Sequence, residues 1–267
     1  LRTLNLDNAP GGVNFKIAEK IGLKNVRILE AKKIALGKAD TFVPTAQAED
    51  VRKALFDAGC GNIGNYDLCS YNMEGEGTFR AREGATHTVG DRELHTEREV
   101  RIETIIPAYK KAATVKALLA AHPYEEPVYD IYPLQNSWPQ AGAGVIGELE
   151  VPETELEFLK RIKKTFEVGC LRHNKLLGRE IQTVALCGGA GAFLMPLAIR
   201  NRADVFITGE IKYHDYFGHD TDILLAEIGH YESEQYTKEI FYTIIRDLFP
   251  HFEVQMTKVN TNPIKYM

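Results

Sequence analysis

The second half of the chain alternates short apolar runs with amphipathic segments, and this alternation limits the possible folds more than any other feature. Helical periodicity covers 153–166, 193–201 and 232–249, and the apolar runs that alternate with these segments lie at 145–149, 181–187, 203–208 and 222–228. Strands that alternate with helices in this way form a sheet of parallel strands. We therefore expect a largely parallel α/β sheet from Gly144 onward.

The start of the chain fits the same pattern. Apolar residues recur every four positions from Val13, which predicts a helix over 13–21 with one apolar stripe. Gly22 suits the C-terminal cap of that helix, and a strand is expected at 25–29.

The middle of the chain reads differently. Helices are expected at 47–58 and 110–121, and strands at 41–44, 68–73, 77–81, 99–106 and 127–134, with Glu74-Gly75-Glu76 joining the second strand to the third. The order β-α-β-β-(β)-α-β is typical of a ferredoxin-like split unit, whose two helices cover one face of the sheet. The expected fold is an α/β domain of residues 1–37 and 143–267, interrupted by an α+β insert of residues 38–142.

Composition narrows the class of protein. The 267 residues are 44% hydrophobic with a net charge of -5, which fits a globular chain and argues against nucleic acid as a partner. No run approaches the roughly 20 apolar residues that span a bilayer, so no membrane partner is expected. The four cysteines are widely spaced, which favours reduced thiols and a cytoplasmic location.

The strongest candidate for chemistry follows the run at 222–228. His230 and Glu234 are four residues apart, so both project from one face of a helix that starts where the strand ends. An imidazole and a carboxylate in this position suit a divalent ion such as zinc, iron or manganese. The alternative is a solvated pair on a helix surface. Asp7, just before the first helix, is a second candidate ligand, and the alternative for it is a turn or capping role.

Two further segments could bind a phosphate. Gly188, Gly189 and Gly191 lie between a strand and a helix, where backbone amides can approach an anion, although a plain tight turn fits equally. Lys212 could contact a phosphate and His214 could transfer a proton, and the alternative is an ordinary polar loop.

Together these motifs resemble the Nif-three-like family, whose members are often labelled GTP cyclohydrolase 1 type 2 homologues. The resemblance spans essentially the whole chain and is carried by NLDNAPGGVN, AHPYEEPVYDIYPL, CGGAGAFL, ADVFITGEIKYHDYF, IGHYESEQ and VNTNPIKYM. It implies a Nif-three-like α/β fold that holds a pair of divalent metals. In longer members it implies a PII-like or CutA-like ferredoxin-type insert, which corresponds to residues 38–142 here.

The resemblance also assigns ligands. Asp7 matches the aspartate of the family's NLD motif, and His230 and Glu234 match its GHYxxE motif. The family places further histidine ligands, including an adjacent pair, upstream of NLD, and many members have a histidine where this chain has Thr3. We therefore expect the N-terminal part of the α/β domain to be missing from this chain and the dinuclear site to be incomplete as written.

The function implied is metal-dependent hydrolysis of a nucleotide or related phosphate compound by a ring-shaped homohexamer. Glu234 and His214 are the expected catalytic residues, and Lys212 with the three glycines of 188–191 would hold the phosphate. The alternative is a non-catalytic metal-binding, regulatory or adaptor protein.

Overall fold

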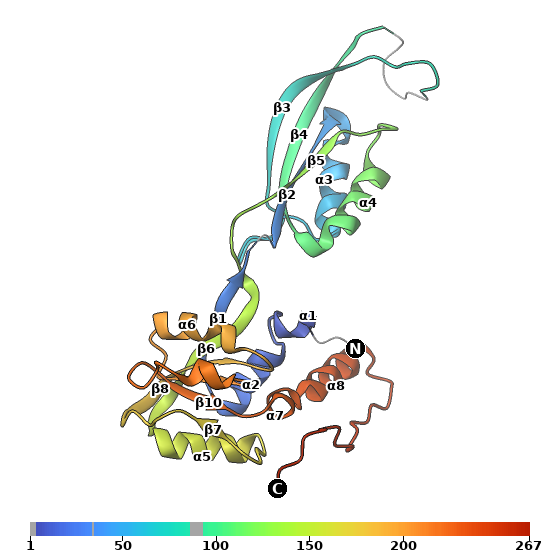
Figure 1. Cartoon of the computed structure of the whole chain (residues 1–267). Coiled ribbons are helices and arrows are strands. Elements are labelled where there is room, and N and C mark those ends of the chain that lie inside the picture. The colour runs from blue at the N-terminus through green and yellow to red at the C-terminus, as the bar shows by residue number, and fades with distance from the viewer. Residues whose placement is uncertain (1–3, 34, 86–92) are drawn as a thin grey trace. The chain divides into compact units, whose positions relative to one another are not determined.

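The computed structural model describes residues 4–33, 35–85 and 93–267, which form two compact units (Figure 1). The interrupted unit consists of Leu1–Lys32 and Pro139–Met267, and the inserted unit consists of Lys33–Trp138. The boundaries expected from the sequence, 38 and 142, lie a few residues further along the chain than these.

A six-stranded sheet organises the interrupted unit. Its order is β1 (Lys24–Lys32), β6 (Trp138–Thr154), β8 (Glu180–Cys187), β9 (Val205–Thr208), β10 (Leu224–Glu227) and β7 (Arg172–His173). Strands β8, β9 and β10 are parallel, whereas β6 pairs antiparallel with β8 and β7 pairs antiparallel with β10. The expected parallel pairing is thus found at the centre of the sheet, among β8, β9 and β10.

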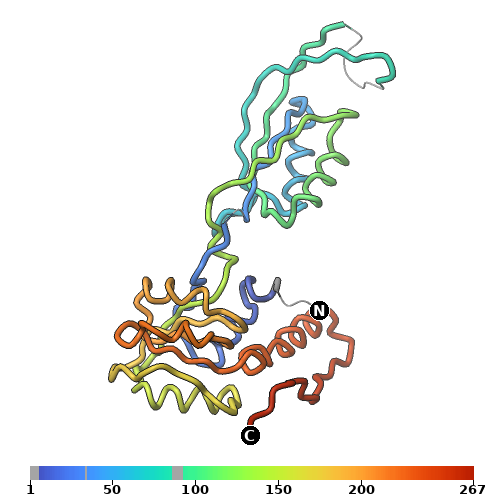
Figure 2. The backbone as a smooth tube through the Cα atoms, in the orientation of Figure 1, coloured from blue at the N-terminus to red at the C-terminus, as the bar shows by residue number. Residues whose placement is uncertain are grey.

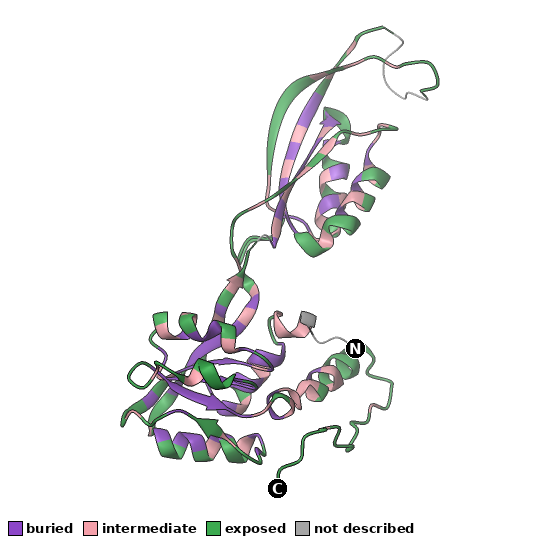
Figure 3. Ribbon diagram, in the orientation of Figure 1, coloured by how far each residue is buried: buried purple, intermediate pink, exposed green. Residues whose placement is uncertain are grey.

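Helices cover both faces of this sheet. One face carries α2 (Val13–Ile21), α5 (Glu155–Thr165) and α8 (Thr237–Leu248), and the other carries α6 (Met195–Arg200). Successive residues of β8 point to opposite faces, so Val184 packs with α2 and α5 while Ala185 packs with α6. The central strands are buried on both faces, as a parallel sheet requires (Figure 3).

The helix ends of this unit follow the capping rules. Gly22, with φ of +83°, ends α2 as the sequence predicts. Thr154 and Glu157 form a reciprocal capping box at the start of α5. The helix expected at 232–249 is instead two helices, α7 (His230–Glu234) and α8.

The inserted unit has ferredoxin-like topology. Its chain order is β2 (Leu36–Pro44), α3 (Ala48–Asp57), β3 (Ser70–Phe79), β4 (His95–Pro107), α4 (Lys111–Ala121) and β5 (Tyr129–Pro133). The antiparallel sheet has the order β3-β4-β2-β5, and α3 and α4 lie on the same face of it (Figure 1). This arrangement is the split βαβ unit that the sequence predicts.

One expectation for this unit is wrong. The segments 68–73 and 77–81 were expected as two strands with Glu74-Gly75-Glu76 between them, but β3 is continuous from Ser70 to Phe79. The long strand β4 pairs with it over its whole length, from Ser70 opposite Thr104 to Phe79 opposite His95. The partner strand thus keeps the glycine-containing stretch extended, although glycine weakens a strand by itself.

A buried histidine should make the inserted unit sensitive to acid. His122 accepts a hydrogen bond from the Tyr124 amide at Nδ1, and its Nε2 lies 3.0 Å from the Phe42 carbonyl oxygen. The imidazole is therefore neutral, and burial lowers its pKa below the ordinary 6.5. Below about pH 6.5 the imidazole binds a proton in the unfolded chain but not in the folded chain, so the free energy of unfolding falls as the pH falls.

We expect this loss to be about 1.4 kcal/mol for each pH unit over which only the unfolded state is protonated. Urea unfolding at about pH 7.5 and about pH 5 measures it, and His122→Gln should flatten the dependence. An equally steep dependence in the variant would contradict this role for His122.

The last segment of the chain runs without helix or strand (Figure 2). Asn262 Nδ2 donates to Glu232 Oε1 at 3.0 Å, and the Tyr266 ring packs directly on Gly169. These contacts hold Asn262 and Tyr266 against the rest of the interrupted unit. Among the helices that the structure describes, none is both long enough and apolar enough to cross a membrane.

Candidate functional site

Three loops meet at the carboxyl edge of the parallel strands. Strands β8, β9 and β10 run in the same direction, so their ends lie at one edge, where α/β sheets place ligand sites. The loop after β9 bonds to the loop after β8, because the amides of Gly209 and Glu210 donate to the Gly189 carbonyl at 2.9 and 3.1 Å. The loop after β10 joins them, because the Gly189 amide donates to Ser233 Oγ at 2.9 Å.

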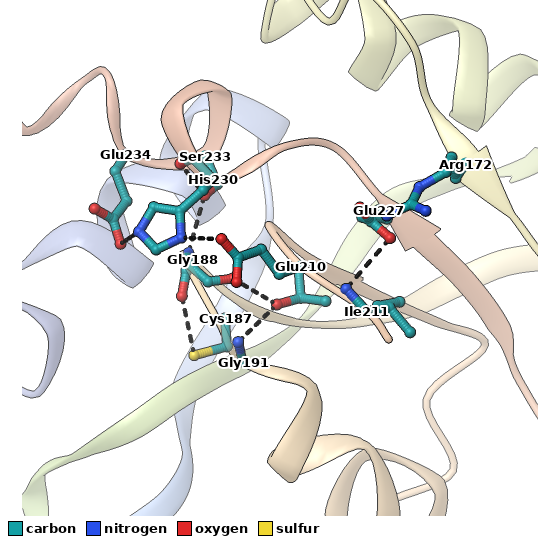
Figure 4. Close-up of polar contacts among 12 residues, drawn as sticks. Arg172, Cys187, Gly188, Gly191, Glu210, Ile211, Glu227, His230, Ser233 and Glu234 are labelled. Carbon is teal, nitrogen blue, oxygen red and sulfur yellow. Dashed lines mark hydrogen bonds and ion pairs between the residues drawn. The ribbon is translucent and has the colours of Figure 1, made fainter. Parts of the chain in front are cut away.

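The structure brings together the two residues of the helical pair. Gly229, with φ of +94°, turns the chain out of β10 and into α7. His230 and Glu234 then face each other, with 3.6 Å between Nε2 and Oε1 (Figure 4). The other ring nitrogen of His230, Nδ1, lies 2.7 Å from Oε1 of Glu210.

Asp7 ends the short helix α1 (Leu4–Asp7) near the same edge. Asn14, buried at the start of α2, fixes this position, since its Nδ2 donates to the Asp7 carbonyl and its Oδ1 accepts from the Gly188 amide, both at 2.8 Å. Burial raises the pKa of the Asp7 carboxyl, and the charge of His230 opposes that rise. Asp7 therefore lies within electrostatic reach of His230.

Negative charge accumulates at this edge. Burial raises the pKa of Glu234, the charges of Asp7 and Glu210 raise it further, and only His230 opposes them. Half-buried carboxyls that lack enough positive charge are typical of a site that stabilises a cation.

The donor set fits a divalent ion in chemistry but is not a complete shell. Carboxylates and imidazole are ligands that zinc, iron and manganese accept. Within residues 4–33, 35–85 and 93–267, however, no three His, Cys, Asp or Glu side chains lie close enough together to hold a metal ion by themselves. His230 and Glu234 converge, and Asp7 lies near them.

The glycine loop has a different bonding pattern from a phosphate cradle. The amides of Gly188, Gly189 and Gly191 donate inside the protein, to Asn14, Ser233 and Thr208 respectively. An amide hydrogen that is already donated is not free for a ligand. This bonding opposes the phosphate-binding role predicted for the three glycines.

Gly189 instead lets the loop approach the histidine–glutamate pair. A Cβ at this position, where φ is +63°, would lie 2.5 Å from Oε1 of Glu234 and 3.3 Å from Nε2 of His230. The loop therefore passes directly beneath His230 and Glu234, and its left-handed backbone conformation at Gly189 favours glycine.

Lys212 and His214 line a cavity of about 770 Å³ beside this edge, and Glu210 lines it too. Glu227 of β10 anchors the loop that carries them, because its Oε2 accepts from the Ile211 amide at 3.2 Å and from the Tyr216 hydroxyl at 2.8 Å. Arg172 of β7 pairs with the same carboxylate (Figure 4). The structure thus places both predicted residues in one cavity, next to the glutamate that contacts His230.

Cys187 lies at the end of β8, where its thiol is buried. Burial, with the negative charge of Asp7, raises the pKa of its thiol to about 12. A thiol with such a pKa is protonated at neutral pH, and the protonated form is unreactive.

Comparison with known proteins decides the family. The chain matches the family described as Duf34/NIF3 (NGG1p interacting factor 3) over residues 4–263. The chain belongs to the Duf34/NIF3 family. A Duf34/NIF3 relative from Halalkalibacterium halodurans, named GTP cyclohydrolase 1 type 2 homolog, is 38% identical, and the match covers 98% of this chain and 72% of the relative. The relative of the same name from Bacillus subtilis is 34% identical, with the same coverage.

A solved structure supports the Duf34/NIF3 fold. The Bacillus cereus protein related to NIF3 superposes with a TM-score of 0.80 at 35% identity, covering 98% of this chain and 71% of that one. Thr3, where many members of the family are expected to have a histidine, lies outside the described residues.

Sequence reasoning missed Glu210 and Asn14 in this Duf34/NIF3 site. Glu210 follows Gly209 after β9, just as His230 follows Gly229 after β10. That shared position, an ionisable side chain one residue past a strand-ending glycine, is the signal that could have found Glu210. Asn14 lies within a predicted helix and shows no comparable signal.

Proposed function

We propose that this Duf34/NIF3 protein binds divalent metal through Asp7, His230 and Glu234 and hydrolyses a nucleotide beside that site. The observation that carries the proposal is the convergence of His230 and Glu234 at the edge of the parallel strands. The carboxyl groups around them outnumber the positive charges. The name GTP cyclohydrolase 1 type 2 homolog, given to the relatives, supports a nucleotide as substrate.

Zinc, iron or manganese suits the donor atoms of these three side chains, and two ions are expected. His230 would bind through Nε2, the ring nitrogen on the side of Glu234. A divalent ion held there would supply Lewis-acid polarisation of the bond to be cleaved.

The chain's own residues would bind and orient the substrate. Lys212 Nζ, in the cavity beside Glu210, would neutralise a phosphate oxygen. His214, in the same cavity, would accept or donate a proton at a ring nitrogen. Glu234, the other expected catalytic residue, would act as a ligand of the metal through its carboxylate. The homohexamer stays a prediction from the family resemblance.

The test uses the natural, full-length protein loaded in turn with zinc, iron and manganese. We expect bound metal in stoichiometric amount and metal-dependent turnover of GTP or another nucleotide in a panel. His230→Ala should lose both, whereas Glu150→Ala, an exposed glutamate of β6, should keep both. Equal turnover in His230→Ala and the natural protein would sink the proposal. Stoichiometric metal without turnover of any nucleotide would favour a non-catalytic metal-binding protein.

A further inference from the structure

We propose that Glu210 is a positioning residue that sets the tautomer and the orientation of His230. This inference deepens the proposed function and rests on it for its consequence in metal binding. The juxtaposition of Glu210 and His230, which are 20 residues apart, comes from two neighbouring strand ends.

The hydrogen bond decides which ring nitrogen is free. His230 Nδ1 lies 2.7 Å from Glu210 Oε1 (Figure 4). An ionised carboxylate can only accept, so Nδ1 must carry the hydrogen and donate it. In the neutral form of the imidazole, the lone pair then lies on Nε2, the nitrogen that faces Glu234 at 3.6 Å. Glu210 thus prepares Nε2 as a ligand.

The backbone holds Glu210 on both sides. On the N-terminal side, the amides of Gly209 and of Glu210 itself donate to the Gly189 carbonyl. On the C-terminal side, the Ile211 amide donates to the buried carboxylate of Glu227. The carboxylate of Glu210 is therefore presented from a fixed segment, as an orienting group must be.

The pair does little for stability. The side chains of His230 and Glu210 are 47% and 57% exposed, and ion pairs this exposed contribute little to folding. A short, well-placed hydrogen bond that folding does not need is consistent with a role at the site. Carboxylates in this relation to a ligating histidine commonly change metal affinity by about 10- to 100-fold.

The experiment measures two quantities on the natural, full-length protein with ¹⁵N-labelled histidine. The ring ¹⁵N shifts of the metal-free protein report the tautomer of His230, and His230→Ala identifies its signals. A competition titration gives the zinc dissociation constant. The variants are Glu210→Ala, which removes the acceptor, and Glu210→Gln, which keeps an acceptor oxygen without its charge. Glu150→Ala is the matched control.

We expect the neutral ring of His230 to carry its hydrogen on Nδ1 in the natural protein, and Glu210→Ala to shift the population of the neutral ring toward Nε2. Zinc affinity should fall about 10- to 100-fold in Glu210→Ala and less in Glu210→Gln, with thermal unfolding unchanged. An unchanged tautomer in Glu210→Ala would overturn the inference, and so would a changed tautomer with unchanged zinc affinity. If the natural protein binds neither zinc, iron nor manganese but the tautomer shifts, the proposed function fails while the control of His230 by Glu210 stands.

Discussion

Replacing Glu234 with alanine is expected to weaken divalent metal binding by more than the roughly 10- to 100-fold that the loss of an outer-shell partner costs. Its half-buried carboxylate lies 3.6 Å from His230 Nε2, so alanine removes one of two converging donors. Removal should leave folding almost unchanged, because burial and the charges of Asp7 and Glu210 already disfavour the ionised carboxyl. If Glu234 is a ligand, the substitution should weaken metal binding and leave stability almost unchanged. If Glu234 is a structural residue, the substitution should lower stability instead.

Metal content by mass spectrometry and urea unfolding of the metal-free protein separate these patterns. We expect Glu234→Ala to lose its metal while its free energy of unfolding stays within about 1 kcal/mol of the natural protein. Glu150→Ala should keep both properties. Full metal occupancy in Glu234→Ala would contradict the assignment of Glu234 as a ligand.

Replacing Gly209 with alanine is expected to disrupt the junction of the three loops. A Cβ on Gly209 would lie 2.7 Å from the Gly189 carbonyl oxygen and 2.9 Å from both His230 Cα and Ser233 Oγ. Two of these neighbours are backbone atoms that cannot move alone, so the loops must separate. We expect a loss of about 1–3 kcal/mol in the free energy of unfolding and weaker metal binding, because Glu210 and His230 move apart.

Gly75→Ala is the matched control for this substitution. Gly75 lies in β3 of the inserted unit, and a Cβ there meets nothing within 4 Å. Its free energy of unfolding should change by about 0.5 kcal/mol or less. If urea unfolding gives the same value for both variants, the close approach at Gly209 does not hold the loops together.

The local sequence pattern was enough to predict much of this fold. The spacing of Val13, Ile17 and Ile21 predicts α2, and the i,i+4 spacing predicts that His230 and Glu234 share a face. Periodicity is less informative for very short elements. The two residues of β7 and the four of α1 are too few to show a period, and neither was predicted.

Features set by distant partners could not be read from spacing. The continuity of β3 depends on its pairing with β4, and the antiparallel edges of the six-stranded sheet depend on where β6 and β7 dock. In the same way, Asn14 contacts Gly188 across 174 positions of sequence. Tertiary contacts of this kind override local preference.

The central claim is that Asp7, His230 and Glu234 hold metal at the edge of the parallel strands. Anomalous X-ray scattering from crystals of the natural, full-length protein, grown with zinc or manganese, tests it most directly. The account predicts anomalous peaks within ligand distance, about 2.0–2.3 Å, of His230 Nε2 and of the carboxylates of Asp7 and Glu234. Peaks only at other side chains, or none at this edge in metal-saturated crystals, would contradict it.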